Sequence, residues 1–568
     1  MTPPLDRRTL LKAGAAAGGL VAVGARPASA QAAPAQAATS VFRHGVASGD
    51  PLGTAVVLWT RVTPSRDAAP GSGRGASTTV VWELADDPAF RAVRRTGTVR
   101  TAATSDHTVK VDVTGLSPYT RYWYRFRALG VTSPVGRTQT AADDGRLHAL
   151  RLAFVSCANW TGGYFTGYRY VARRDDLDLV LHLGDYLYEY GNAEDRYGPA
   201  TLVGEREHDP ATEMVSLSDY RRRHAQYKTD PDLQAAHAAH PWIVVLDDHE
   251  VANDTYDTGA ENHTEGAEGA FGTRRTRAYQ AYVEWMPIRL PDQTGAVGVR
   301  FWRRFSFGPL ADLSVIDTRQ NRSIPLDGVQ GALVGTDLAG LTDPSRVLME
   351  PAQMAWLTDG LRDDAVRWHL IGNQTVFTRV ALGRSTPQAL APLGLGSAAF
   401  NTDQWDGYQD DQRQVLQAMA AAGGDPVVLT GDIHSSWAND CPLDPSAYVP
   451  VGPLNDSVGV EFVCPSITSD GFTEILGGDE AALAATTGLQ VTNPHVRYLD
   501  GIGHGFAVLD VTPERVQSDF WFVSSREDQD ATLRYASGWQ STRGSRQVVA
   551  ARGPVGARSD RPRTAVVT

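Results

Sequence analysis

Short runs of apolar residues, each followed by a cluster of polar side chains, recur through the middle of the chain. The apolar runs span residues 152–155, 179–183, 243–246, 370–371 and 427–429. The clusters that follow them are Ser156-Cys157-Ala158-Asn159, Gly184-Asp185-Tyr186-Leu187-Tyr188, Asp247-Asp248-His249-Glu250, Gly372-Asn373-Gln374 and Gly431-Asp432-Ile433-His434. A buried strand delivers its last residue to a crevice where loops meet, so we expect these clusters to converge on one point.

The pattern of the rest of the chain predicts two kinds of domain. Residues 41–140 contain short Val-, Thr-, Tyr- and Trp-rich stretches with frequent turn signals, which predict a small all-β sandwich of the immunoglobulin or fibronectin type. Over residues 150–525, strand patterns alternate with helical patterns at 218–240 and 270–285, which predicts an α/β (α+β) domain with a central sheet covered on both faces. The predicted strands at 506–511 and 520–523 should complete that sheet.

Two segments lack the pattern of a packed element. Residues 191–209 are charged and have no apolar period, so we expect a mobile loop over the site. Residues 544–568 are basic and contain Pro and Gly, which predicts a disordered tail.

The N-terminus has the features of an export signal. Arg7-Arg8 precedes a weakly apolar stretch, and Ala28-Ser29-Ala30 offers small residues for cleavage, so residues 1–30 are predicted to be a twin-arginine signal peptide. A disordered basic tail would explain the arginines but not the cleavage site. We therefore expect a secreted, extracytoplasmic protein that is exported in the folded state, and no later apolar run is long enough to span a bilayer.

Composition narrows the choice of partners. The chain has 568 residues and a formal net charge of -12, which argues against a stable complex with nucleic acid.

The chain has three cysteines, so in an oxidising compartment at least one thiol has no partner for a disulfide within the chain. Cys441 and Cys464 can pair and leave Cys157 free among the polar clusters, or all three can be small buried hydrophobic residues. For Cys157 we favour metal ligation.

The clusters contain the ligands of a site for two unlike metal ions. Asp185 is the best candidate for a bridging ligand. The phenol of Tyr188, the thiol of Cys157 and the imidazole of His434 suit a hard trivalent ion such as Fe(III). The other ion would be bound mostly by oxygen, which favours Ca²⁺. Its candidate ligands are Asp185, Asp248, Asp432 and the amide of Asn373 or Gln374. Each residue also has a structural interpretation, as a helix cap, an exposed acidic turn or core packing.

Three of these motifs carry a family resemblance. Gly184-Asp185-x-x-Tyr188, Asp247-Asp248-His249-Glu250 and Gly431-Asp432-Ile433-His434 resemble the motifs of calcineurin-like metallophosphoesterases, in their PhoD-type alkaline phosphatase branch. The resemblance covers nearly the whole mature chain and implies one Fe(III) and one or two Ca²⁺ ions. It assigns the bridge to Asp185 and the iron phenolate to Tyr188. Cys157, Asp248, Asp432 and His434 become further ligands, and Asn373 and Gln374 are the likeliest substitutes for a missing histidine.

The resemblance also implies catalytic residues. His249 is expected to donate to the phosphoryl oxygens or to protonate the leaving alkoxide, with Glu250 orienting its ring. Asn159 and Arg319 are expected to hold phosphate, although Arg319 can equally form a surface salt bridge. The expected reaction is in-line attack on phosphorus by a metal-bound hydroxide.

The sequence thus predicts a secreted, metal-dependent alkaline phosphatase or phosphodiesterase. Its expected partners are a phosphate ester substrate and the twin-arginine export machinery, and the mature protein is expected to be a monomer. One alternative is a phospholipase D-like phosphodiesterase that acts on phospholipids. Another is a non-catalytic secreted binding protein in which the metals have only a structural role.

Overall fold

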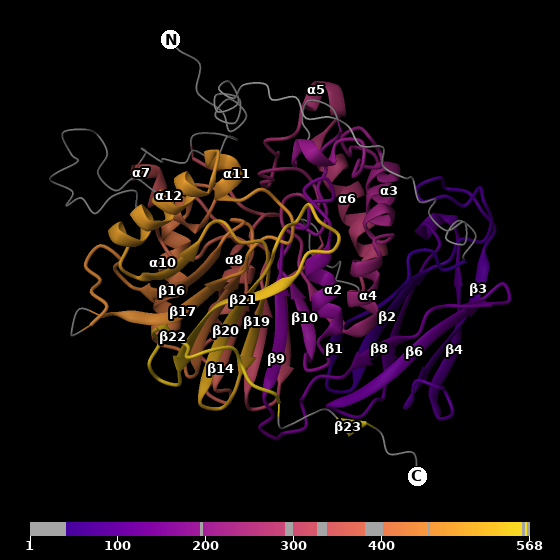
Figure 1. The fold of residues 1–568 in the computed structure, drawn as a ribbon, viewed down its shortest axis with the longest axis horizontal. Coiled ribbons are helices and arrows are strands. Elements are labelled where there is room, and N and C mark those ends of the chain that lie inside the picture. The colour runs from indigo at the N-terminus through magenta and orange to yellow at the C-terminus, as the bar shows by residue number, and fades with distance from the viewer. Residues whose placement is uncertain are drawn as a thin grey trace.

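The computed structural model describes residues 41–192, 197–289, 299–326, 338–380, 401–451, 455–558 and 563–564. The predicted signal peptide lies outside these ranges. Figure 1 shows the N-terminal strands at one end of the molecule and the later elements, such as α12 and β16, at the other. The largest sheet runs between these two ends.

Within the described residues, the largest sheet is ten-stranded and combines strands from both ends of the chain. Its strands, in spatial order, are β22 (Val549–Ala550), β21 (Leu533–Thr542), β20 (Arg515–Val523), β19 (Gly505–Val511), β9 (Leu150–Val155), β10 (Leu179–His182), β11 (Pro241–Val244), β1 (Val46–Leu52), β2 (Ala55–Arg61) and β5 (Thr108–Thr114). β19 and β20 occupy the two C-terminal segments that were predicted to complete the sheet.

A second sheet of seven strands packs against the first. Its order is β12 (Arg303–Phe307), β13 (Ala311–Val315), β14 (Trp368–Gly372), β15 (Asp425–Thr430), β17 (Ser457–Val463), β16 (Ser436–Pro442) and β18 (Val496–Asp500). One apolar core joins residues of both sheets, such as Leu152 and Leu181 from the first and Leu313 and Leu429 from the second. The two sheets therefore face each other across a shared core.

Helices cover the outer faces of this pair of sheets. A second core packs α2 (Thr166–Arg173), α3 (Leu217–Tyr227), α4 (Pro231–Ala239) and α6 (Phe271–Trp285) on the larger sheet. A third packs α8 (Pro351–Gly360) and α10 (Gln409–Ala420) on the smaller sheet. The other described helices are α12 (Asp479–Thr492) and the short elements α5 (Glu265–Glu268), α7 (Leu338–Leu341), α11 (Phe472–Leu476), η2 (Ala103–Ser105), η3 (Ala200–Leu202) and η5 (Trp405–Gly407). The layers are thus helix, sheet, sheet and helix.

The helical pattern predicted over residues 218–240 is divided into two helices. α3 begins with a capping box formed by Ser216 and Asp219. α4 begins after Asp230, whose side chain accepts hydrogen bonds from two backbone amides, and it has proline at its first position. Pro231 cannot continue the preceding helix, because it lacks an amide hydrogen, so the chain restarts there. The helix predicted over 270–285 is confirmed as α6.

The N-terminal sandwich is built partly from the ten-stranded sheet. Its other sheet contains β4 (Val93–Thr101), β3 (Thr78–Ala85), β6 (Thr120–Ala128) and β23 (Arg563–Thr564), with β7 (Val131–Thr132) and β8 (Gly136–Gln139) also paired to β6. One apolar core joins β3 and β6 to β1, β2 and β5. β1 pairs in parallel with β11, and Gly49 lies opposite Trp242. A Cβ atom on Gly49 would lie 2.1 Å from the Pro287 carbonyl oxygen, so only glycine fits this junction.

The segment after Gly544 does not have the predicted disorder over residues 544–558. β22 pairs with β21, and Val548 is buried. Arg546 forms an ion pair with Asp425 at 3.2 Å, and Arg558 pairs with the buried carboxylate of Asp178. The basic residues that suggested disorder are thus partners for carboxylates of the main domain. The rest of the predicted tail, apart from β23, lies outside the described residues.

All three cysteines are free and buried, so of the two alternatives left open by the sequence the Cys441–Cys464 pair does not form. The register between β16 and β17 explains why. Trp437 lies opposite Val463, which places Cys464 at one end of the ladder and Cys441 at the other. The two thiols pack into different apolar cores, as small buried hydrophobic residues do.

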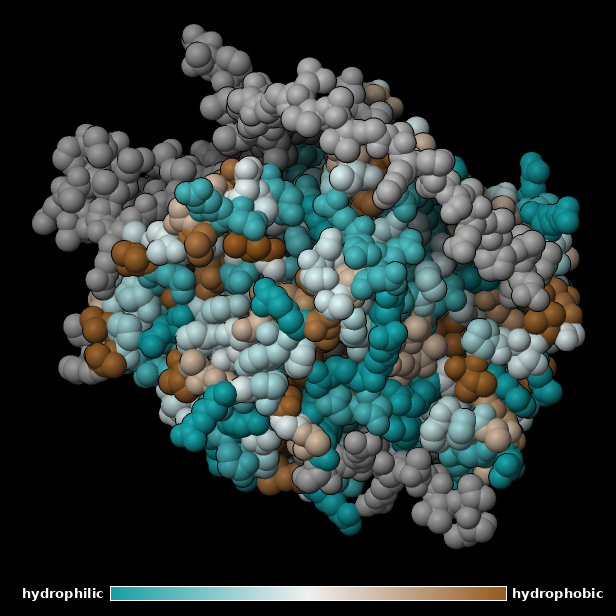
Figure 2. Space-filling model, in the orientation of Figure 1, coloured by the Kyte–Doolittle hydropathy of each residue, from teal (hydrophilic) through white to brown (hydrophobic). Residues whose placement is uncertain are grey.

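The molecular surface is mixed in character. Figure 2 shows mostly hydrophilic and intermediate residues on the displayed face, with hydrophobic residues in separate groups. Exposed Leu483 and Val491 lie on α12, for example. Isolated apolar residues of this kind are usual on protein surfaces. Among the described helices, none combines the length and the apolar character needed to cross a bilayer.

Candidate metal centre

The ends of the inner parallel strands meet at one edge of the two sheets. In the larger sheet Val155 lies opposite His182, and in the smaller sheet Gly372 lies opposite Leu429. The polar clusters begin at these positions or within two residues after them. The first two clusters are tied together by hydrogen bonds from the Cys157 amide to Gly184 O, at 3.2 Å, and from the Ala158 amide to Asp185 O, at 2.9 Å.

Four candidate ligands share an uncommon backbone conformation. The φ angles are 60° at Cys157, 53° at Asp185, 60° at Asp432 and 55° at His434. Residues other than glycine rarely adopt this left-handed backbone conformation, and those that do are often found at functional sites. Each of these residues follows a strand end, so the sharp turn redirects its side chain immediately after the strand.

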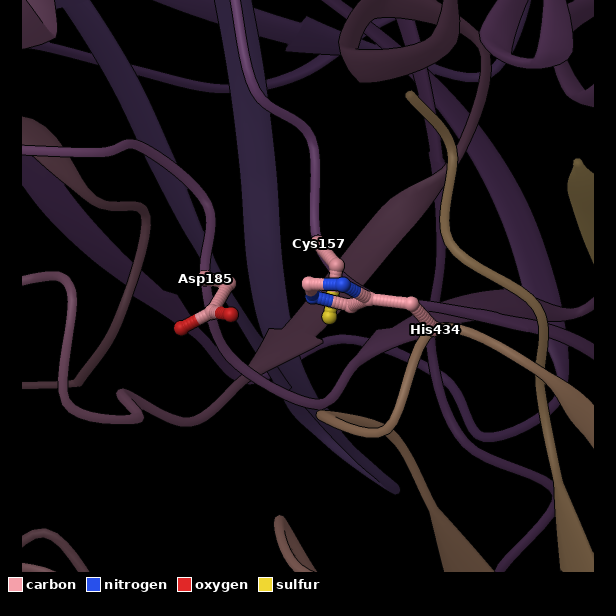
Figure 3. Close-up of side chains that lie close together, drawn as sticks. All are labelled: Cys157, Asp185 and His434. Atoms are coloured by element: carbon pink, nitrogen blue, oxygen red, sulfur yellow. The ribbon is translucent and has the colours of Figure 1, made fainter. Parts of the chain in front are cut away.

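The first group of ligand atoms comes from three different loops. Ligand atoms of Cys157, Asp185 and His434 lie within 4.8 Å of one another. Figure 3 shows these three side chains side by side, each on its own loop. The hydroxyl of Tyr188 lies 2.9 Å from Asp185 Oδ2 and 3.3 Å from His434 Nε2. The sequence therefore identified four side chains, including a thiol, a phenol and an imidazole, that the fold does bring together.

The His434 ring is held by its other nitrogen. His434 Nδ1 lies 2.7 Å from the carbonyl oxygen of Asp470, which leaves Nε2 on the side of Tyr188. Tyr197 also contacts His434 Nδ1 at 3.3 Å, and its ring stacks on that of Tyr188 with centroids 6.0 Å apart. Tyr197 belongs to the segment 191–209, so the described part of this predicted loop lies beside the site. Residues 193–196 lie outside the described residues.

The second group consists of carboxylates. Oxygens of Asp185, Asp247, Asp248 and Asp432 lie within 4.8 Å of one another. Asp185 belongs to both groups, which is the arrangement expected of a bridging ligand. Asp248 and Asp432 occupy the side predicted for an ion with oxygen ligands. Asp247 was not among the predicted ligands.

The donor atoms are suited to bind a cation. Asp185 Oδ1 and Asp247 Oδ2 are buried and have no hydrogen-bond partner in the described structure. Burial raises the pKa of both carboxyls well above the usual range, and neighbouring carboxylates raise it further. Burial, followed by the charge of Asp185, likewise raises the pKa of Cys157 and of Tyr188. A bound cation removes these costs, because it favours the charged form of every one of these groups.

Arg319 is fully buried within the carboxylates. Its Nη1 lies 2.8 Å from Asp403, its Nη2 lies 2.8 Å from Asp432, and its Nε contacts Asp247. The Asp248 carboxylate lies 3.7 Å away. The alternative of a surface salt bridge is therefore wrong, because no part of this side chain is at the surface. The predicted phosphate contact finds no support here, since Nε, Nη1 and Nη2 all contact carboxylates.

The partner of His249 differs from the one expected. His249 Nδ1 lies 2.7 Å from Glu189 Oε2, whereas Glu250 accepts backbone hydrogen bonds from Asp185, Tyr186 and Asp247. Glu250 thus braces the turns that carry the ligands and does not orient the ring. Burial alone would lower the pKa of His249, but Asp185, Glu189 and Asp248 together raise it well above the usual value.

The three predicted amide side chains make hydrogen bonds within the protein. Asn159 donates to Tyr197 O and accepts from Thr161 at 3.1 Å. Asn373 Oδ1 accepts from Trp405 Nε1 at 3.0 Å. Gln374 Oε1 accepts from Thr318 at 2.8 Å, and its amide group donates to two carbonyl oxygens. In this arrangement the structure gives no support for a metal bond from Asn373 or Gln374, or for a phosphate contact from Asn159.

Sequence reasoning missed several residues of the centre. Asp247 and Glu189 stand next to predicted residues, at positions 248 and 188, so their motifs already pointed to them. Asp403 and Gln404 follow none of the predicted strands and gave no such signal. Gln404 Nε2 donates to Asp432 Oδ2 at 2.6 Å, and Asp403 also pairs with Arg322 at 2.7 Å.

The architecture can now be compared with that of known proteins. The solved structure of purple acid phosphatase PPD1 from yellow lupin (Lupinus luteus) superposes with a TM-score of 0.50 at 13% identity, over 89% of this chain and 76% of that one. At this identity the likeness concerns the fold alone. Two facing sheets covered by helices and preceded by an all-β region agree with the predicted fold class.

Closer relatives define the family. The model of the PhoD-like phosphatase family matches residues 152–520, and that of the PhoD-like phosphatase N-terminal domain matches residues 27–142. Alkaline phosphatase D of Bacillus subtilis (strain 168) is 37% identical over 482 residues, which is 84% of this chain and 77% of the relative. A solved structure of PhoD superposes with a TM-score of 0.79 at 33% identity, over 90% of this chain and 92% of that one.

The chain belongs to the PhoD-like phosphatase family. The protein is accordingly an enzyme, a phosphoesterase, and the predicted resemblance is confirmed. Membership of an enzyme family removes the alternative of a non-catalytic binding protein with purely structural metals.

Proposed function

We propose that the protein is a metal-dependent phosphoesterase that hydrolyses phosphate monoesters or diesters at the centre formed by Asp185 and its neighbours. One observation carries this proposal. Asp185 contributes to both ligand groups and keeps a buried oxygen without a partner among the described residues. A buried carboxylate oxygen without a partner is costly to maintain, and a role as bridging ligand accounts for it.

The chemistry of the two ligand groups supports unlike metals. Cys157, Tyr188 and His434 supply a thiol, a phenol and an imidazole, which suit Fe(III) in the proposed site. Asp248 and Asp432, with Asp247, supply only oxygen, which suits Ca²⁺. Bound at these positions, the ions would activate water and offset the negative charge that develops on the phosphoryl oxygens.

The protein groups around the ligands then have separate tasks. His249 lies close to Asp185 and Asp248, where its ring can donate a proton to the oxygen of the leaving alcohol. Glu250 holds the backbone of the two ligand-bearing turns through three amide hydrogen bonds. Arg319 balances part of the charge of Asp247, Asp403 and Asp432, which would otherwise repel one another.

Activity on three substrates tests the reaction class. An aryl phosphate monoester, an aryl phosphodiester and phosphatidylcholine should be compared at equal concentration, with the metal-loaded enzyme and after chelation. We expect hydrolysis of at least one aryl ester, its loss on chelation, and its recovery with added Fe(III) and Ca²⁺. Exclusive release of choline from phosphatidylcholine would favour the phospholipase D-like alternative, and full activity after complete metal removal would contradict the proposal.

We also propose export by the twin-arginine route, with the mature enzyme acting outside the cytoplasm. The basis is the sequence alone: Arg7-Arg8, the weakly apolar stretch and the small residues at 28–30. Changing Arg7-Arg8 to Lys-Lys should leave the precursor in the cytosol, as fractionation and immunoblotting would show. Undiminished secretion of the Lys-Lys variant would contradict this route.

A further inference from the structure

A buried carboxylate outside the two ligand groups controls the environment of His249. Glu189 is fully buried, and its Oε2 lies 2.7 Å from His249 Nδ1. Its other oxygen, Oε1, accepts from the Asn253 amide at 2.8 Å and from Asn262 Nδ2 at 2.7 Å. Both oxygens are therefore engaged, so the carboxylate has a fixed orientation.

The His249 ring is also fixed from its faces. The ring centroid lies 4.0 Å from that of Tyr188 and 5.4 Å from that of Tyr190. The backbone amide of His249 donates to Asp248 Oδ1 at 3.1 Å. With Nδ1 held by Glu189, Nε2 remains the ring nitrogen that is available to a substrate. These contacts hold the ring in one orientation, in which Nε2 is the nitrogen left for a substrate.

We propose that Glu189 is a positioning residue that aims His249 Nε2 at the oxygen of the leaving alcohol. As the attacking water forms a new bond to phosphorus, the bond from phosphorus to the leaving oxygen breaks, and Nε2 gives its proton to that oxygen. His249 keeps its Nδ1 proton in the hydrogen bond to Glu189, and solvent later restores the proton on Nε2. This inference rests on the proposed role of His249 and adds the residue that makes that role geometrically possible.

The leaving group provides a readout that a merely structural role would not change. p-Nitrophenolate departs without help, whereas an alkoxide needs a proton. We expect Glu189→Gln to lower kcat for an alkyl phosphate by about 10- to 100-fold, the usual effect of losing an outer partner of a site residue. The same variant should lower kcat for p-nitrophenyl phosphate by less than about 3-fold, since acid assistance contributes little there.

Glutamine is the informative replacement because it preserves shape. Its carbonyl oxygen can still accept from Asn253 and Asn262, while its amide cannot accept a proton from His249 Nδ1. Glu213→Gln is the matched control, because Glu213 is a neighbouring, partly buried carboxylate that pairs with Arg274 at 2.7 Å and does not contact His249. The control should leave both substrates unaffected. Iron and calcium per chain should be the same in all variants.

The outcomes separate this inference from the proposed function. If His249→Ala shows the leaving-group dependence and Glu189→Gln does not, the positioning role of Glu189 is wrong. If His249→Ala itself slows both substrates equally, the proposed role of His249 fails first. Equal losses for both substrates in Glu189→Gln would also overturn the positioning role, as would loss of metal from that variant.

Discussion

Two buried regions of this protein are rich in ionisable groups, and they treat charge in opposite ways. The metal centre gathers Asp185, Asp247, Asp248 and Asp432 around Arg319. The second region, here called the histidine cluster, surrounds Tyr186 and Trp285. Its members are Lys228, His44, His182, His224 and His237. One region is built of acids whose charged form calls for a bound cation, because burial raises the pKa of Asp185, Asp247 and Asp432. The other is built of bases whose neutral form burial favours.

The contacts explain the difference. Lys228 donates to Tyr186 at 2.6 Å and lies over the Trp59 ring, and within the described chain no carboxylate pairs with it. Burial lowers the pKa of Lys228 and of the four histidines, that of His182 to about 3. Neutral bases need no partner in an apolar interior, whereas the acids of the metal centre need a cation. Burial therefore serves function in the first region and packing in the second.

The largest expected effect comes from removing the shared ligand. Asp185→Asn keeps the size of the side chain and removes its charge. We expect activity to fall by more than about 100-fold, since even partners outside the ligand shell commonly contribute 10- to 100-fold. Bound metal should fall with it, as elemental analysis of the purified variant would show. Wild-type activity in this variant would remove Asp185 from the centre.

Removing the buried guanidinium should mainly affect stability. Arg319→Met removes the guanidinium partner of Asp247 and Asp432, whereas Asp403 keeps Arg322. Breaking a buried ion pair from one side costs about 3–5 kcal/mol. Urea unfolding of the chelated protein should show this loss, and added Ca²⁺ should recover part of it. Arg362→Met is the control, because the exposed pair of Arg362 with Asp359 should contribute less than about 1 kcal/mol. An unchanged free energy of unfolding for Arg319→Met would contradict the charge-balancing role.

Acid should destabilise the protein through the histidine cluster. The folded-state pKa of each histidine is lowered, so below about pH 6.5 the unfolded chain binds protons that the folded chain does not. Stability is therefore present above about pH 6.5 and falls with pH, by about 1.4 kcal/mol per pH unit for each such histidine. His224→Phe should reduce this slope between pH 6 and 4 in chemical denaturation, because it removes one of the histidines that bind a proton only in the unfolded chain. His224 is a suitable choice because its Nδ1 has no hydrogen-bond partner among the described residues. A slope identical to that of the wild type would show that His224 does not contribute.

The smallest effect is expected at Lys228. Burial lowers the pKa of Lys228, which means that the folded protein disfavours the charged form of this lysine, so Lys228→Met should remove a cost. Replacing a buried ionisable group by an apolar one of similar size is often neutral or stabilising, here by about 1 kcal/mol. Thermal or urea unfolding at pH 7 would measure it. A loss of more than about 3 kcal/mol would indicate that Lys228 is charged and paired.

The fold could be predicted from the sequence where the signal was local. Apolar runs that end in polar clusters were sufficient to predict that Cys157, Asp185, Tyr188 and His434 lie together. Parallel strands end at a common edge of the sheet, so the residues that follow them meet there. The break at Pro231 and the pairing of β1 with β11 were not anticipated. A strand pattern contains no information about a partner almost 200 residues away, so the shared sheet of the two domains was hidden.

Long-range contacts also explain what was missed in the site. Glu189 and Glu250 are equally acidic and both adjoin predicted residues, and only the folded chain shows which of them reaches His249. Asp403 follows none of the predicted strands, and its place beside Arg319 depends on packing between segments that are distant in the sequence. The tail after Gly544 was misjudged because Arg546 and Arg558 looked like solvated charges, whereas each has a carboxylate partner in the main domain.

Metal analysis of the purified wild-type enzyme tests the central claim most directly. Iron and calcium should be measured per chain before and after chelation, together with phosphate ester hydrolysis and the absorption band expected of iron bound to phenolate or thiolate. The account predicts one iron and at least one calcium, with activity and the band lost together on chelation and recovered together on reloading. A metal-free protein with full activity would contradict it.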